Sequence, residues 1–242
     1  MSTGTWAGGG VERASAIPIV ALDVPNADRA MALVGELGDA CRYYKVGLEL
    51  FTAEGPAVVR AVRDAGSDVF LDLKFHDIPN TVRGAARSAA ALGARLLTVH
   101  ASGGRAMLEA AVEGAGERCG VLAVTVLTSM DAAGQAAAWG RAALDVRDEV
   151  LRLADLARAA GAHGVVCSGD EVAGVRERHG DALRVLVPGI RLAGSATHDQ
   201  ARVATPLAAA AAGASYLVLG RAVTAAADPR EAMAEVARQL RR

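Results

Sequence analysis

The stretch Val69-Phe-Leu-Asp-Leu-Lys74 is an almost continuous apolar run that ends in charged side chains. Apolar runs of this length are typical of strands that are covered on both faces, as they are in parallel sheets. Similar runs recur along the whole chain. They predict eight strands, at Ile17–Leu22, Arg42–Val46, Val69–Leu73, Leu96–His100, Val121–Leu127, Gly164–Cys167, Val185–Val187 and Tyr216–Leu219.

Segments rich in Ala, Leu and Arg, with helical periodicity, lie between these runs. They predict helices at Ala27–Leu37, Pro56–Ala65, Thr81–Leu92, Arg105–Gly114, Val146–Ala160 and Pro229–Gln239, and the alanine-rich residues 205–214 predict another. Strand-then-helix units joined by short links indicate an α/β fold, a single-domain (β/α)8 TIM barrel. A doubly wound open sheet is the alternative, which the lack of a G-x-G-x-x-G after the first strand disfavours.

Length and composition bound the class of protein. A chain of 242 residues suits one barrel, which we expect to occupy residues 17–242 behind a flexible, Gly-rich N-terminal arm, residues 1–16. A net charge of -1 with interspersed acids and bases predicts no nucleic-acid partner. No apolar stretch approaches the roughly 20 residues of a membrane span. The three widely spaced cysteines are typical of a reducing compartment, and we expect a cytoplasmic protein.

Polar residues follow the predicted strands at their carboxyl ends, the edge where the active sites of such barrels lie. Charged groups at the rim of an apolar core require either a ligand or mutual pairing. The residues at this rim are Asp23, Lys45, Asp72, Lys74, His100, Thr128, Ser129, Arg191, Gly220 and Arg221.

Asp72 and Lys74 are candidate catalytic residues. Because side chains alternate between the faces of a strand, both are expected to point into the mouth of the barrel, with Asp77 in the following loop and Lys45 on the adjacent strand. Two cations can then alternate with two anions. A purely structural ion-pair network is the alternative, but desolvating several charges is costly and often adds no stability, which favours a functional site.

Lysine is rare in this chain. Only Lys45 and Lys74 are lysines among the 26 basic residues. Arginine is planar and stays protonated, whereas a lysine ammonium can release a proton and take it up again. Lysine at these two positions therefore indicates chemistry that needs an ammonium. The alternative is chance, in which these two lysines merely remain in a composition that has drifted toward arginine.

The segment Asp72-Leu-Lys-Phe-His-Asp-Ile-Pro-Asn-Thr81 resembles the signature of the orotidine 5'-phosphate decarboxylase family, and the resemblance extends over nearly the whole chain after the arm. It implies the same barrel and the conversion of orotidine 5'-phosphate to UMP and CO2 without a metal or organic cofactor. Other segments in the family's order are Val20-Ala-Leu-Asp23, Tyr44-Lys-Val-Gly47, Val99-His-Ala-Ser-Gly103, Val124-Thr-Val-Leu-Thr-Ser-Met130, Val187-Pro-Gly-Ile-Arg191 and Val218-Leu-Gly-Arg221.

The resemblance also implies roles for the charged residues. Lys74 would stabilise a C6 carbanion and then protonate it, Asp72 would lie near the leaving carboxylate, and Lys45 would orient Asp72 and contact the ribose. Asp77 would reach the site from the partner subunit of a homodimer, followed across the interface by Ile78 and Thr81. The other implied substrate contacts are Asp23 at a ribose hydroxyl and Thr128 at the pyrimidine, with Ser129 as a substitute for Thr128.

The phosphate end of the site can also be predicted without the family. Barrels often bind phosphate with the loops after their seventh and eighth strands and with a helix N-terminus. Gly220 permits a close approach of the backbone there, and Arg221 offers a planar fork to a dianion. Arg191 and Gln200 flank a polar loop, residues 194–198, that can close over the ligand.

Two other functions stay open. Sister enzymes on the same barrel, 3-keto-gulonate-phosphate decarboxylase and hexulose-phosphate synthase, share the Asp-x-Lys-x-x-Asp spacing but use Mg2+ and resemble each other in carrying an acid near the place of Lys45. A cation there opposes metal binding, so we predict no metal site, and the Ile78-Pro-Asn-Thr81 continuation favours the nucleotide enzyme. A catalytically silent nucleotide-binding barrel would have lost a member of the charged array, and none is lost.

Overall fold

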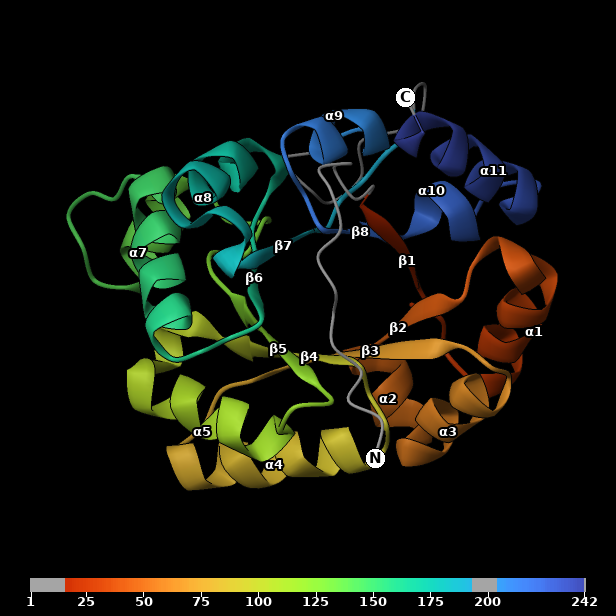
Figure 1. The fold of residues 1–242 in the computed structure, drawn as a ribbon, viewed down its shortest axis with the longest axis horizontal. Coiled ribbons are helices and arrows are strands. Elements are labelled where there is room, and N and C mark those ends of the chain that lie inside the picture. Colours follow the sequence, from red (N-terminus) through yellow and green to blue (C-terminus); the bar gives the residue numbers. More distant parts are fainter. Residues whose placement is uncertain (1–15, 193–203, 242) are drawn as a thin grey trace.

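The strands close into a parallel barrel in which each strand pairs with the next along the chain and the last pairs with the first (Figure 1). The computed structural model describes residues 16–192 and 204–241. The predicted (β/α)8 TIM barrel is confirmed, and the open-sheet alternative is wrong. The strands are β1 (Ile17–Ala21), β2 (Tyr43–Gly47), β3 (Asp68–Phe75), β4 (Leu96–His100), β5 (Gly120–Val124), β6 (Gly164–Val166), β7 (Arg184–Val187) and β8 (Tyr216–Leu219).

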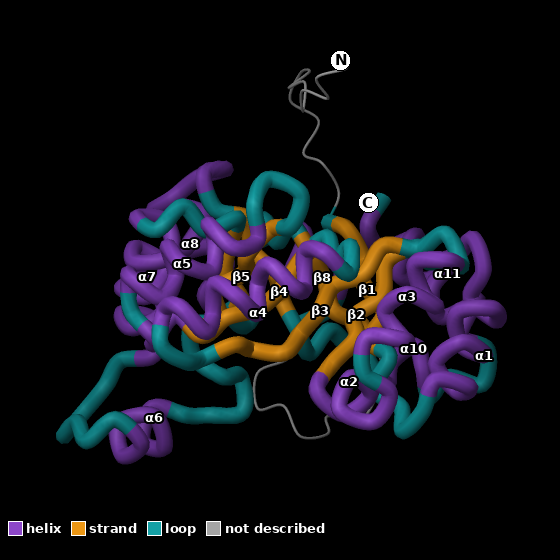
Figure 2. Tube along the Cα trace, turned by 90° about the horizontal axis from the view of Figure 1, so that it is seen from below, coloured by secondary structure: helices purple, strands orange, loops and turns teal. Residues whose placement is uncertain are grey.

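Helices cover the outside of the barrel (Figures 1 and 2). They are α1 (Ala27–Leu37), α2 (Leu48–Glu54), α3 (Pro56–Asp64), α4 (Pro79–Ala91), α5 (Arg105–Ala115), α6 (Ala132–Ala138), α7 (Val146–Ala159), α8 (Val172–His179), α9 (Pro206–Ala211), α10 (Arg221–Thr224) and α11 (Pro229–Leu240). The bounds of α1 agree with the prediction at both ends. Asn26 accepts a hydrogen bond from the Arg29 N–H at its start, and Gly38, with φ 49°, follows its end.

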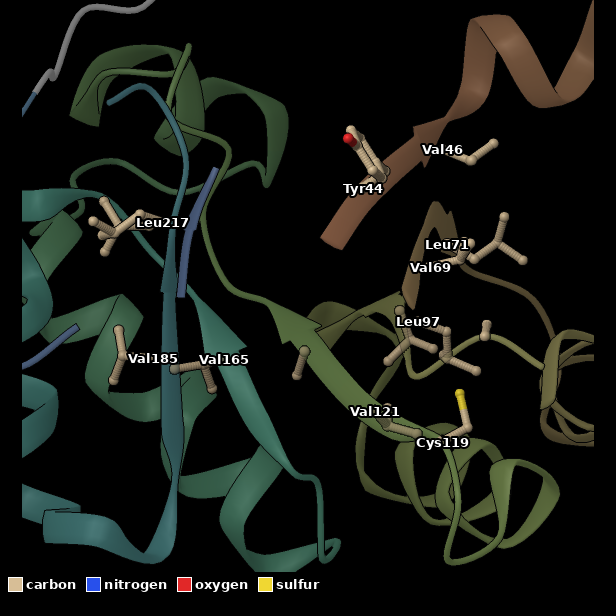
Figure 3. Packing of buried hydrophobic residues seen from close by; sticks show 14 of the residues in the cluster. Tyr44, Val46, Val69, Leu71, Leu97, Cys119, Val121, Val165, Val185 and Leu217 are labelled. Atoms are coloured by element: carbon tan, nitrogen blue, oxygen red, sulfur yellow. The ribbon is translucent and has the colours of Figure 1, made fainter. Parts of the chain in front are cut away.

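Apolar side chains form two layers, because successive residues of a strand point to opposite faces. The outer layer packs the strands against the helices and includes Leu71, Leu97, Val121 and Val165 (Figure 3). Burying a side chain of this size stabilises the fold by about 1.5–3 kcal/mol. The two layers therefore hold the carboxyl ends of the strands in a fixed ring. The inner layer consists of Ile19, Ala21, Phe70, Leu96, Leu122, Leu186 and Val218.

Two strands, β3 and β5, depart from their predicted bounds by more than one residue at one end. β3 continues beyond Leu73 to Phe75, and its register with β4 shifts between Leu71 and Phe75. β5 ends at Val124, three residues before the predicted Leu127. Val126 and Leu127 are as apolar as strand residues, but the strand ends at Val124, and the hydroxyl of the next residue, Thr125, donates to the Val166 carbonyl at 2.7 Å.

A long connection, residues 125–145, joins β5 to α7 and carries α6 away from the ring of helices (Figure 2). Its end is fixed by Glu149 on α7, whose side chain is only 3% exposed. Glu149 accepts hydrogen bonds at 3.0 Å from Arg141 of the connection and from Arg152 of α7. The hydrogen bonds from Arg152, opposed by burial and assisted by Arg141, lower the pKa of this carboxyl.

The predicted arm, residues 1–16, lies outside the described residues except for Ala16, which is buried. The domain bounds 1–16 and 17–242 therefore stay a prediction. Across residues 16–192 and 204–241, none of the helices combines the length and the apolar character that crossing a membrane requires.

Candidate active site

A cavity of about 630 Å³ opens at the carboxyl ends of the strands, a volume within the usual range of small-molecule sites, roughly 300–1,000 Å³. Phe70, Leu186 and Val218 of the inner layer line it, so an apolar floor lies below a charged rim. Nine of the ten predicted rim residues, all except His100, line the same cavity. They are Asp23, Lys45, Asp72, Lys74, Thr128, Ser129, Arg191, Gly220 and Arg221.

Charged side chains alternate in sign across the ends of β1, β2 and β3. The Lys45 ammonium donates a hydrogen bond to Asp23 at 2.7 Å and lies 3.7 Å from Asp72 Oδ2. The Lys74 ammonium donates to Asp72 Oδ1 at 2.8 Å. The array within one chain is therefore Asp23–Lys45–Asp72–Lys74, and opposite charges so close favour each other's ionised forms.

Asp72 is the buried centre of this array, since its side chain is 14% exposed while that of Lys74 is 30% exposed. Burial alone would raise the pKa of Asp72. The positive charges of Lys45 and Lys74, with hydrogen bonds from Lys74 and Thr98, outweigh that effect and hold the pKa below its usual value. Asp72 is therefore a carboxylate at neutral pH, and it keeps two ammonium groups beside the apolar floor.

The backbone of Lys74 departs from a regular strand. Lys74 has a φ of 49°. Among the described residues, it is the only residue other than glycine with a positive φ. Such a conformation costs about 1–3 kcal/mol and often occurs at functional sites. Asp72 and Lys74 do pair, as expected. Their side chains come together because the end of β3 is irregular, at its register shift with β4, and not because side chains of a regular strand alternate between faces.

Gly47, at the end of β2, leaves room for the lysine of the same strand. A Cβ atom at this position would lie 2.8 Å from the Lys45 ammonium and 3.0 Å from Asp23 Oδ1. Real Cβ atoms essentially never approach another atom to 2.8 Å, and 3.0 Å is also tight, so a side chain here would displace the Lys45 ammonium from its ion pair. The glycine of the Tyr44-Lys-Val-Gly47 segment thereby preserves the position of Lys45.

The opposite side of the cavity offers donors to an anion. Arg191 donates from Nη1 to the Ile190 carbonyl at 3.1 Å, whereas its buried Nε has no hydrogen-bond partner in the described structure. A buried donor without a partner costs about 1–3 kcal/mol, and an anionic ligand would satisfy it. Gly220 precedes α10, whose first residue is Arg221, and nothing lies within 4 Å of a Cβ built on Gly220. Gln200, the other predicted residue of this side, lies outside the described residues.

The predicted site residues in the loop after β3 and at the start of α4 do not line the cavity of their own chain. The side chains of Asp77, Ile78 and Thr81 are exposed, and Ile78 is 67% exposed although it is apolar. Asp77 Oδ1 accepts a hydrogen bond from the Ile78 N–H at 2.6 Å. These three residues are therefore available to a second molecule at the rim and are not part of the array within one chain.

Three polar residues that the sequence analysis did not single out also line the cavity, namely Glu49, Thr98 and Thr224. Thr98 lies in β4, within a run that reads as ordinary strand. Glu49 lies in the first turn of α2, a helix that periodicity did not predict. Among the described residues, no three His, Cys, Asp or Glu side chains gather as metal ligands.

Comparison with known proteins places this geometry in a family. Residues 17–236 match the model of the Orotidine 5'-phosphate decarboxylase / HUMPS family. The chain is 55% identical over 227 residues to an orotidine 5'-phosphate decarboxylase of Anaeromyxobacter sp. (strain K), covering 91% of this chain and 96% of the relative. It is 52% identical over 229 residues to the enzyme of that name from Thermobifida fusca, covering 94% and 97%.

Solved structures give the same result. The crystal structure of orotidine 5'-phosphate decarboxylase from Lactobacillus acidophilus superposes with a TM-score of 0.83 at 36% identity, covering 94% of this chain and 100% of that one. The enzyme from Pyrococcus horikoshii OT3 superposes with a TM-score of 0.76 at 26% identity, covering 93% and 100%. The family model spans nearly all of the barrel, and the chain belongs to the Orotidine 5'-phosphate decarboxylase / HUMPS family.

Proposed function

We propose that the protein decarboxylates orotidine 5'-phosphate to UMP and CO2, the last step of de novo pyrimidine nucleotide synthesis, without a cofactor. The observation that carries the proposal is the Lys74 ammonium, held by Asp72 at 2.8 Å above an apolar floor, in a chain of this family. Loss of CO2 leaves an electron pair on C6 that the pyrimidine ring cannot delocalise. An ammonium fixed beside that carbon is the device this chemistry needs.

Lys74 has two tasks in this reaction. As the C6–CO2 bond breaks, its positive charge stabilises the electron pair that remains on C6. It then donates a proton to that carbon, and the amine regains a proton from solvent. Because the ammonium is already positioned and only 30% exposed, little solvent has to reorganise as charge develops.

Asp72 serves two purposes in the same step. It holds Lys74 by an ion pair, and its negative charge would lie beside the carboxylate of the substrate. Repulsion between two carboxylates disfavours the bound ground state and is relieved when neutral CO2 leaves. Lys45 lies 3.7 Å from Asp72 and is suited to orient this carboxylate. Asp23 and Lys45 are proposed to meet the ribose.

Binding of the phosphate would supply energy at a distance from C6. Arg191, with its buried Nε unpaired within the described residues, and Arg221 after Gly220 form the anion side of the cavity. Gln200 is proposed to join them. Energy gained there can serve the closure and desolvation of the reacting centre. Thr128, with Ser129 beside it, is proposed to meet the pyrimidine.

We further propose that the enzyme is a cytoplasmic homodimer with its active sites at the interface. Asp77, Ile78 and Thr81 are exposed beside the cavity but do not line it. In a dimer they would complete the site of the partner, with Asp77 next to Lys74 of the other chain. An exposed Ile78 at such a rim is suited to burial in an interface.

The nearest alternative is a Mg2+-dependent decarboxylase or synthase acting on a sugar phosphate. Lys45 argues against this alternative. Its ammonium donates to Asp23 at 2.7 Å and lies 3.7 Å from Asp72, so it already pairs with the carboxylates that a divalent ion would need as ligands. The proposed reaction needs no metal, so chelators separate the two.

The experiment follows the absorbance of orotidine 5'-phosphate with purified protein, with and without excess EDTA. We expect turnover to UMP at the same rate in both. A barrel without catalytic activity would leave the absorbance unchanged. Activity that is lost in EDTA and restored by Mg2+, or turnover of a keto-sugar phosphate in place of the nucleotide, would favour the alternative.

A further inference from the structure

Thr98 occupies the irregular point where β3 and β4 meet. Leu71 pairs with Leu97 and Phe75 pairs with Val99, so that one residue of β4, Thr98, faces three residues of β3. In a regular ladder, backbone carbonyls would accept the amides of this stretch. Here the side-chain hydroxyl of Thr98 accepts a hydrogen bond from the Lys74 N–H at 2.9 Å.

The same hydroxyl also reaches the carboxylate of the array. Thr98 Oγ1 donates to Asp72 Oδ1 at 2.9 Å, and this is the oxygen that receives the Lys74 ammonium at 2.8 Å. A threonine hydroxyl has one proton to donate and lone pairs to accept, so both bonds can exist together. Thr98 is 1% exposed, so water does not compete for either bond.

We infer that Thr98 is a positioning residue for the reaction: its hydroxyl fixes both the backbone turn at Lys74 and the Asp72 oxygen that holds the Lys74 ammonium. The inference rests on the proposed decarboxylation, and it adds an uncharged residue that acts through Asp72 and Lys74. Without the hydroxyl, the left-handed turn at Lys74 loses its only side-chain acceptor on β4 among the described residues, and Asp72 loses a donor.

Replacement of Thr98 by valine keeps the shape of the side chain and removes the hydroxyl. We expect kcat for orotidine 5'-phosphate to fall about ten-fold to a hundred-fold, because small misplacements of catalytic groups have effects of this size. KM should change little, since Thr98 does not lie at the proposed phosphate end. Thr98→Ser, which restores the hydroxyl, should recover most of kcat.

The pH profile gives a readout that a purely structural residue would not change. The hydrogen bond from Thr98 is one of the causes that lower the pKa of Asp72. Its removal raises that pKa, so the acidic limb of kcat/KM should move to higher pH in Thr98→Val and return in Thr98→Ser.

Thr125→Val is the matched control. Thr125 is also a threonine buried at the end of a strand, 3% exposed, and its hydroxyl bonds to the Val166 carbonyl outside the charged array. It should lose some stability and keep both kcat and the position of the acidic limb.

Lysine-selective 15N labelling tests the arrangement without any assay. The chain contains only Lys45 and Lys74, so the spectrum has two lysine amide signals. Thr98→Val should shift the Lys74 signal strongly and the Lys45 signal little. In the wild-type protein the Lys74 amide hydrogen should exchange slowly with solvent, because it is bonded to Thr98. This measurement tests the inference even if Thr98→Val does not fold.

Three results would overturn the inference: wild-type kcat in folded Thr98→Val, a Thr98→Ser variant as impaired as Thr98→Val, or rapid exchange of the Lys74 amide in the wild-type protein. An inactive wild-type protein whose Lys74 amide is protected would instead contradict only the proposed reaction. The two failures are therefore distinguishable.

Discussion

At the scale of single residues, the ammonium of Lys74 is the group on which the proposed reaction depends. We expect Lys74→Ala to abolish turnover while the circular dichroism spectrum stays that of the wild type, because the side chain is 30% exposed and its removal opens no cavity in the apolar layers. Steady-state kinetics measure the effect, and a variant that kept a tenth of wild-type kcat would refute the role. Arg95→Ala is the control, since it removes an exposed cation paired with Asp68 and should leave kcat near the wild-type value.

Gly47 supports a second prediction. An alanine Cβ there would meet the Lys45 ammonium at 2.8 Å, so Gly47→Ala must displace Lys45 from Asp23 or Asp72. We expect kcat/KM to fall by about ten-fold or more, with the fold retained. Gly35→Ala on α1 is the control, because nothing lies within 4 Å of its Cβ and kcat/KM should not change. Equal kinetics for Gly47→Ala and the wild type would show that Lys45 can move without effect.

The residues of the site were predictable to the extent that charge stands out in an apolar run. Lys45, Asp72 and Lys74 could be found because an unpaired charge at a strand end needs an explanation. Thr98 could not, because a hydroxyl in a strand is common and its two bonds exist only after β3 departs from regular geometry. The positive φ of Lys74 could not be predicted either, because a positive φ is expected at glycine and this position holds a lysine.

At the scale of elements, the connection from β5 to α7 depends on Glu149. We expect Glu149→Gln to lower the free energy of unfolding by about 1–3 kcal/mol at neutral pH, because a buried carboxylate that accepts charged hydrogen bonds is lost. KM for orotidine 5'-phosphate should rise as well, since Thr128 and Ser129 lie in the connection that Arg141 fixes to Glu149. Urea unfolding and steady-state kinetics measure the two effects.

The pH dependence of this difference follows from the lowered pKa of Glu149. The stabilisation is fully present above the ordinary pKa of a glutamate, about 4.3, and it is lost as the pH falls through the lower pKa of the folded protein. The gap between wild type and Glu149→Gln should therefore narrow in acid. Glu113→Gln, which removes an exposed carboxylate paired with Arg83, should differ from the wild type by less than about 1 kcal/mol. A gap that did not depend on pH would contradict the assigned ion pair.

Elements with strong local signals were predicted well. The start and end of α1 are encoded by Asn26 and Gly38, so its bounds needed no knowledge of packing. The end of β5 was misplaced because Val126 and Leu127 are apolar, although the chain has already left the sheet. Short helices such as α2 and α10 were not predicted, because four to seven residues carry too little periodicity.

At the scale of the whole molecule, the proposed dimer gives a complementation test. Lys74→Ala and Asp77→Ala are each expected to be inactive alone. After subunit exchange, a mixed dimer would contain one site with both Lys74 and Asp77 intact, and activity should return to at most about half of the wild type. Assays of the mixture before and after exchange measure the recovery. If exchanged subunits remained inactive, the shared site would be wrong, and Asp77→Ala with wild-type activity would remove Asp77 from the reaction.

The barrel was predictable as a whole because eight buried runs alternating with helices admit few topologies, and the strands pair in sequence order. The excursion that carries α6 was not, because residues 125–145 contain no feature that separates a local turn from a long connection. Nor can one sequence tell whether exposed Ile78 faces solvent or a partner, since either environment accepts the same residue.

The pairing of Ile17 in β1 with Tyr216 in β8 has a consequence for synthesis. The first strand to leave the ribosome is among the last to find its second neighbour, because nearly the whole polypeptide must be made before the ring can shut. Until then the nascent sheet has two open edges, which invite pairing with other chains. Premature termination upstream of Tyr216 would leave those edges permanently exposed and favour aggregation over a smaller working enzyme.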